Sequence, residues 1–98
     1  MIELDKIEFD KKQKAVVLFG ACAWCANCRE AKRKLESLED KYPEFTFCEI
    51  DVDKHIDIGD EYKIYELPTL IAFKGNKEIS RWTDEIGDLL GWINMLTW

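Results

Sequence analysis

Runs of apolar residues alternate with polar stretches along the chain, and the pattern predicts interleaved strands and helices. Ala15 to Gly20 is continuously apolar, which is typical of a strand buried on both faces. Thr69 to Lys74 is a second apolar run, and Phe45 to Val52 alternates in part. Two shorter segments, Ile2 to Leu4 and Lys77 to Trp82, complete the expected strands. Gly75-Asn76 between the last two runs predicts a β-hairpin.

Helical periodicity appears between these strands. The segment from Cys25 to about Lys41 carries one apolar stripe at helical spacing, and Pro43 ends it. A weaker helix is expected from His55 to Lys63, and one or two helical turns from Asp5 to Lys12. A final helix is expected to begin at a cap on Thr83 or Asp84. Its core face would comprise Ile86, Leu89, Leu90, Ile93 and Leu96.

This order predicts an α/β fold. The strand–helix–strand unit around Cys25 implies a right-handed crossover and a parallel pair. The closing hairpin adds antiparallel strands, so we expect a mixed central sheet of four or five strands flanked by helices. The chain of 98 residues has room for one core, and we expect a single domain over residues 1–98.

Cys25-Ala26-Asn27-Cys28 lies at the junction of the first long strand and the first long helix. Cysteines at this spacing can close a small disulfide ring, and this context favours a redox role. A cysteine at a helix N-terminus faces unpaired backbone N–H groups, which favour the thiolate. The thiolate is the species that attacks disulfides.

Charge and hydropathy exclude several other classes. A net charge of −6 argues against nucleic acid or an acidic membrane as partner, because both require clustered Lys and Arg. No apolar run approaches the ~18 residues of a membrane span, and the N-terminus lacks the pattern of a signal peptide. We therefore expect a cytoplasmic protein. Its four cysteines are then more typical of catalytic, metal-binding or buried residues than of structural disulfides.

Together these residues resemble the thioredoxin family. The resemblance rests on Trp24-Cys25-x-x-Cys28 after a buried strand, on Leu67-Pro68-Thr69 about forty residues later, and on the hairpin Thr69 to Trp82 before a terminal helix. It implies a three-layer α/β/α fold, with Cys25 as attacking thiol, Cys28 as resolving thiol and a cis Pro68 beside them. It also implies a substrate surface comprising Trp24, Ala26, Asn27, Leu67 and Pro68, with an apolar rim at Trp24, Leu67 and Pro68.

The chain departs from the family at two functional positions. The family usually buries an Asp six residues before the first cysteine, and counting back from Cys25 gives Phe19. A Lys on the following strand is matched by Glu49. We expect Glu49 to supply the missing carboxylate as proton acceptor for Cys28; alternatively it reaches solvent or pairs with a Lys. The N-terminal segment is also shorter than usual, so the family's first helix could be truncated or absent.

The remaining cysteines leave alternatives open. Cys22 precedes the motif, so Cys22, Cys25 and Cys28 could bind a metal ion or an iron–sulfur cluster. Alternatively, Cys22 could exchange with Cys25, or it could be a small loop residue that faces away from the site. Cys48, on an apolar strand, is expected to be buried and inert. Trp92 and Trp98 fall on the expected last helix, where they could form a partner surface or cover the core.

The sequence thus predicts a thiol–disulfide oxidoreductase that reduces protein disulfides. Electrons must come from an external donor of the thioredoxin-reductase type, because the chain shows no flavin or nicotinamide motif. No cofactor and no metal are expected, and a monomer is plausible. The alternatives are a glutaredoxin-like protein fed by glutathione, the metal-binding module, and a non-catalytic interaction domain.

Overall fold

The computed structural model describes residues 1–96, and Trp98 lies outside them. Five strands form one sheet in the order β1-β3-β2-β4-β5. The strands are β1 (Ile2–Glu3), β2 (Lys14–Gly20), β3 (Phe45–Asp51), β4 (Thr69–Lys74) and β5 (Lys77–Thr83). The helices of the described residues are α1 (Ala26–Leu38), α2 (Ile56–Glu61) and α3 (Leu89–Asn94).

The sheet is mixed, as the pattern of elements predicts. β2 pairs with β3 in parallel across the α1 crossover, and β1 joins the outer side of β3, also in parallel. β4 runs antiparallel to both β2 and β5, which confirms the hairpin. The central strand β2 is buried from Ala15 to Gly20 because both of its neighbours and both helical layers cover it.

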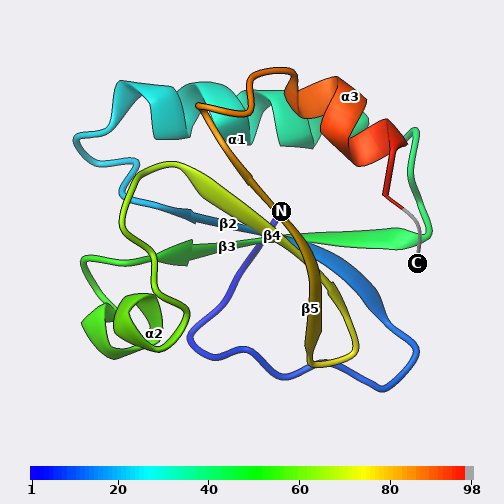
Figure 1. Ribbon diagram of the computed structural model, residues 1–98, viewed down its shortest axis with the longest axis horizontal. Coiled ribbons are helices and arrows are strands. Elements are labelled where there is room, and N and C mark those ends of the chain that lie inside the picture. Colours follow the sequence, from blue (N-terminus) through cyan, green and yellow to red (C-terminus); the bar gives the residue numbers. More distant parts are fainter. Residues whose placement is uncertain (97–98) are drawn as a thin grey trace.

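The sheet is the middle of three layers, with α1 and α3 on one face and α2 on the other (Figure 1). One apolar cluster lies on each face of the sheet. The first packs α1 and α3 onto the sheet, with Leu18, Leu35 and Ile93 among its buried members. The second lies on the face covered by α2 and the N-terminal segment, with Phe19 and Phe73 at its centre. No helix in residues 1–96 is both long and apolar enough to cross a membrane.

The prediction of helical turns from Asp5 to Lys12 is wrong. The structure has no helix there, which agrees with the alternative that the family's first helix is absent. The segment instead runs across the second cluster. Its apolar residues Ile7 and Phe9 alternate with charged ones and pack on that cluster, and Phe9 N–H donates to Asn76 Oδ1 at 2.8 Å. In a helix, these two side chains would lie on opposite sides, so only one of them could face the sheet.

The last helix begins later than expected. Thr83 and Asp84 accept turn hydrogen bonds from Ile86 and Gly87, and Gly87 has a φ of +89°, which favours glycine. The helix cap is therefore Asp88, whose Oδ1 accepts from Gly91 N–H at 3.0 Å. Ile86 and Leu90 are consequently exposed rather than in the core, while Leu89 and Ile93 are buried.

Candidate redox site

The redox motif lies where β2 ends and α1 begins, at the left edge of the molecule in Figure 1. Cys25 and Cys28 are joined by a disulfide, with their Cα atoms 5.2 Å apart. Cys25 is the N-cap of α1, and its Sγ accepts a hydrogen bond from Cys28 N–H at 3.1 Å. After reduction this N–H and the positive end of the helix dipole would stabilise the Cys25 thiolate.

The two cysteines of the disulfide differ in exposure. Cys25 is 8% exposed, whereas Cys28 is fully buried. A Cβ placed on Gly20 would lie 3.1 Å from Cys28 Sγ, so the absence of a side chain at the end of β2 makes room for this buried sulfur. An incoming disulfide can therefore reach Cys25 first.

Only part of the predicted substrate surface is exposed in the structure. Trp24 is 64% exposed, and Ala26 and Asn27 are also exposed. The Leu67–Pro68 peptide is cis, and the register of β4 against β2 pairs Thr69 with Phe19, which brings Pro68 to the edge that carries the disulfide. Leu67 is half-buried.

Pro68 does not belong to the apolar rim, contrary to expectation. Its side chain is less than 2% exposed, at the position directly before β4. Two residues that sequence reasoning missed are strongly exposed instead: Ile56 at 67%, at the start of α2, and Tyr65 at 87%, three residues before Pro68. Tyr65 lies in a polar stretch beside the Leu67-Pro68 signature, and its proximity to that signature is the signal that could have identified it.

Phe19, which the spacing matches to the family's buried Asp, does not lie beside Glu49. Phe19 packs on Tyr62, with ring centroids 5.8 Å apart, on the face opposite α1. Leu18 is the residue that pairs with Glu49 in the sheet and packs in the α1 cluster. Counting back from Cys25 ignores the alternation of side chains along β2, which turns successive residues to opposite faces. The residue beside Glu49 is therefore Leu18 rather than Phe19, and it is apolar like Phe19.

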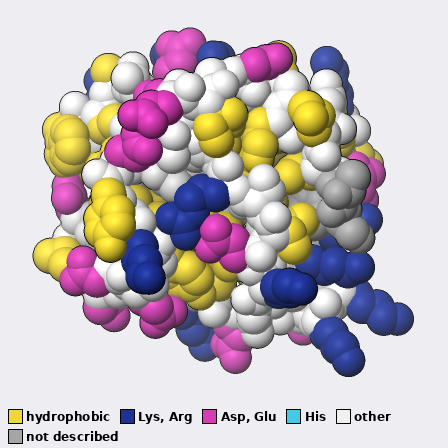
Figure 2. Space-filling model, viewed as in Figure 1, with side chains coloured by type: hydrophobic (Ala, Val, Ile, Leu, Met, Phe, Trp, Pro, Cys, Tyr) yellow, Lys and Arg dark blue, Asp and Glu magenta, His cyan; other side chains and the backbone are white. Residues whose placement is uncertain are grey.

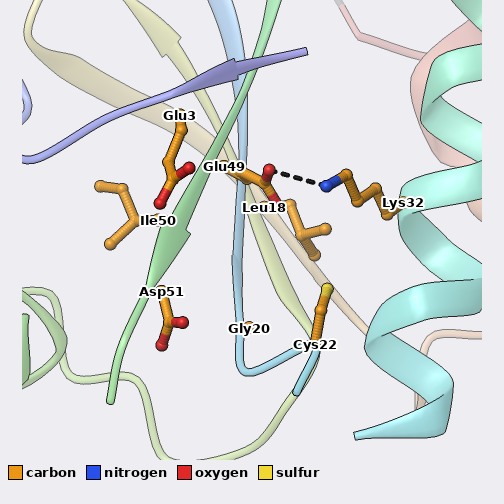
Figure 3. Close-up of a pocket in the computed structure, with 8 residues that line it drawn as sticks. All are labelled: Glu3, Leu18, Gly20, Cys22, Lys32, Glu49, Ile50 and Asp51. Carbon is orange, nitrogen blue, oxygen red and sulfur yellow. Dashed lines mark hydrogen bonds and ion pairs between the residues drawn. The ribbon is translucent and has the colours of Figure 1, made fainter. Parts of the chain in front are cut away.

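Glu49 forms an ion pair, which is one of the alternatives left open for it. Its Oε1 accepts from Lys32 Nζ on α1 at 2.8 Å, and the carboxyl-bearing side chain is 20% exposed (Figure 3). The hydrogen bond to Glu49 raises the pKa of Lys32. The pair lines a cavity of about 150 Å³ together with Leu18, Gly20 and Cys22. A cavity of this size has room for several waters.

Cys22 points into the same cavity (Figure 3). Its backbone carbonyl accepts from Arg29 Nη1 at 2.7 Å, which ties the loop to α1. Burial, followed by the charge of Glu49, raises the pKa of the Cys22 thiol. In residues 1–96 no three Cys, His, Asp or Glu side chains are arranged to hold a metal ion, so the geometry gives no support to the metal-binding alternative.

Cys48 allows a direct test of this assignment of the thiols. It is fully buried on β3, and burial raises its pKa to about 11. At pH 8 only about one thiol in a thousand would be ionised. In the reduced native protein we expect iodoacetamide to label Cys25 at least ~100-fold faster than Cys48. Peptide mapping after timed quenching measures both rates, and comparable rates in the folded protein would contradict the assignment.

Comparisons with known proteins agree with this geometry. The family model for thioredoxin matches residues 3–94. Thioredoxin-1 of Saccharomyces cerevisiae is 31% identical over 77 residues, covering 76% of this chain and 75% of that protein. Thioredoxin H5 of Oryza sativa subsp. japonica is 37% identical over 68 residues, covering 69% of this chain and half of that protein.

A structural comparison gives the same fold. The crystal structure of Chlamydomonas reinhardtii thioredoxin f2 superposes with a TM-score of 0.83 at 22% identity, covering 96% of this chain and 94% of that one. The chain therefore has the thioredoxin fold although Leu18 and Glu49 lie side by side where the family usually has Asp and Lys. The chain belongs to the thioredoxin family, and its Cys25–Cys28 pair is that of a dithiol–disulfide oxidoreductase.

Proposed function

We propose that the protein reduces disulfides in other proteins, with Cys25 attacking and Cys28 resolving. The observation that carries this order is the difference in exposure between the two cysteine residues, combined with the position of Cys25 as helix cap. The Cys25 thiolate attacks one substrate sulfur and displaces the other as a thiolate, which takes up a proton. Cys28 then loses its proton and attacks Cys25 Sγ, releasing the second substrate thiol and leaving the Cys25–Cys28 disulfide.

The substrate peptide would dock on the exposed surface around the disulfide. Trp24, next to Cys25, supplies exposed apolar area there. Ile56 at the start of α2 and Tyr65 in the segment before β4 are also exposed, and Leu67 is half-buried. Within residues 1–96 no hydrogen bond occupies the backbone N–H or C=O of Leu67. Its backbone is therefore available to pair with an extended peptide, while Pro68 has no N–H to offer.

Glu49 is the carboxylate best placed to accept the Cys28 proton. Three carboxylates line the cavity near Gly20, but Glu3 is largely exposed and Asp51 accepts the backbone N–H groups of Asp53 and Lys54. Glu49 is the least exposed of the pair-forming carboxylates and lies on the α1 side, where Gly20 contacts Cys28. Lys32 would hold the carboxylate in position, and water in the cavity would relay the proton.

No cofactor is needed, because the two sulfurs carry the electrons. Each cycle leaves the protein oxidised, so an external dithiol donor of the thioredoxin-reductase type must restore it. We infer that the protein acts in a compartment that keeps thiols reduced, namely the cytoplasm, which is consistent with free Cys22 and Cys48. As a monomer it would leave the docking surface open.

The test is reduction of insulin with dithiothreitol as electron source, followed as turbidity. We expect the protein to accelerate the reaction several-fold over dithiothreitol alone. Glutathione with its reductase, supplied in place of dithiothreitol, should not sustain turnover. If turnover occurred only with glutathione, the glutaredoxin-like alternative would be correct, and no acceleration by either donor would favour a non-catalytic domain.

A further inference from the structure

Two carboxylates accept hydrogen bonds from residues that neighbour the redox cysteines in the sequence. Trp24 Nε1 donates to Asp53 Oδ2 at 2.7 Å, and Asn27 Nδ2 donates to Asp84 Oδ2 at 3.4 Å. Trp24 precedes Cys25, and Asn27 precedes Cys28. Asp53 comes from the loop between β3 and α2, whereas Asp84 comes from the loop between β5 and α3. Negative charge is therefore placed beside the disulfide by two loops far apart in sequence.

The loop that carries Asp84 is well anchored. Trp82 is buried, and its Nε1 donates to Gly87 O at 3.0 Å across the loop. Gly87 N–H donates to Asp84 O within the turn. These bonds anchor the backbone of the loop, and the hydrogen bond from Asn27 Nδ2 orients the exposed Asp84 carboxylate toward the first turn of α1.

Neither carboxylate is neutralised by the protein. Among residues 1–96, none of the ion pairs involves Asp53 or Asp84, and both residues are exposed. The chain as a whole carries a net charge of −6. Figure 2 shows acidic and hydrophobic side chains lying together along the left edge, where Figure 1 places the start of α1. A peptide that docks on the apolar surface must place its own side chains beside these charges.

We propose that the protein selects disulfides flanked by Lys or Arg, with Asp84, oriented by Asn27, as the specificity-determining residue. The proposal rests on the proposed disulfide reduction and names the substrate class of that site. A cationic neighbour of the substrate cysteine is attracted by Asp84 and Asp53, while an anionic neighbour is repelled. Both effects act on docking to Cys25 before any sulfur bond changes, and both weaken with salt.

The experiment compares two peptides of equal length, each with one internal disulfide, flanked by Lys in one and by Glu in the other. Pre-reduced protein, freed of reductant, is mixed with excess peptide in a single turnover followed by tryptophan fluorescence. Each rate is divided by the rate of dithiothreitol with the same peptide, which removes the peptides' own difference in reactivity. We expect a Lys-over-Glu preference of roughly 5-fold or more at 20 mM salt, falling toward 2-fold at 0.5 M.

Three variants test whether the Lys-over-Glu preference comes from Asp84. Asp84→Asn should reduce it by about 2- to 3-fold, and Asn27→Ala, which removes the donor but keeps the charge, should reduce it less. Asp10→Asn makes the same charge change before β2, at the opposite end of the sheet, and should leave it unaltered. A wild-type preference within twofold of unity would overturn the proposal, as would equal effects of Asp84→Asn and Asp10→Asn. If neither peptide is reduced, the proposed function itself fails.

Discussion

Replacing Cys28 by Ser should convert the protein into a trap for its substrates. The variant keeps the Cys25 thiolate, so it still attacks a disulfide, but no second sulfur can release the product. Incubated with an oxidised protein substrate, it should accumulate a mixed disulfide through Cys25, while the steady-state rate of insulin reduction falls to that of dithiothreitol alone. Non-reducing electrophoresis and peptide mapping identify the adduct and its cysteine.

Cys25→Ser is the matched variant. It should lose both reduction and trapping, because Cys28 is fully buried and cannot be reached by a protein substrate. Cys22→Ser should retain both activities. Trapping by Cys25→Ser would show that Cys28 or Cys22 is the attacking thiol, and would reverse the order inferred from exposure.

Replacing Glu49 by Gln should slow the second step and spare the first. The amide keeps the shape of the side chain and a contact with Lys32 but cannot accept the Cys28 proton. Removing a general base typically costs 10²-fold or more, and water in the cavity would compensate in part, so we expect resolution to slow by roughly 10- to 100-fold at pH 7. Acid quenching during a single turnover, followed by mass spectrometry, should reveal the mixed disulfide as a transient species.

Two further readouts separate this role from a structural one. The resolution rate of Glu49→Gln should rise with pH, because ionisation of Cys28 then depends on solvent. Glu36→Gln is the charge control, since Glu36 is exposed on α1 one turn beyond Lys32. Equal resolution rates for the two variants would show that Glu49 serves only its ion pair with Lys32.

Most of the sheet could be predicted from the chain because its strands are marked by local signals. The apolar run at β2, the turn at Gly75-Asn76 and the spacing of α1 each depend on neighbouring residues alone. The failures involve longer-range competition. Asp5 to Lys12 has a composition that suits a helix, but in the structure Ile7 and Phe9 both pack on the second cluster, where Phe9 contacts Phe73. The turn at Gly87 delayed α3 because a positive φ there interrupts the helical pattern.

The candidate site shows the same division. Cys25, Cys28 and Trp24 could be identified from spacing, because a strand–loop–helix junction fixes where they lie. Whether Leu18 or Phe19 lies beside Glu49 on the α1 face depends on the number of residues in the loop between Gly20 and Cys25. Counting back from Cys25 does not reveal which of the two it is. The Asn27–Asp84 contact joins residues 57 positions apart, and the burial of Pro68 depends on how the chain enters β4. Both are properties of the assembled fold.

The most direct test of the account is to equilibrate the protein against graded ratios of reduced and oxidised dithiothreitol, then alkylate and map every cysteine. We expect one two-electron transition in which only Cys25 and Cys28 change state, while Cys22 and Cys48 stay as free thiols throughout. A disulfide that includes Cys22, or a titration in which the Cys25–Cys28 bond never forms, would contradict it.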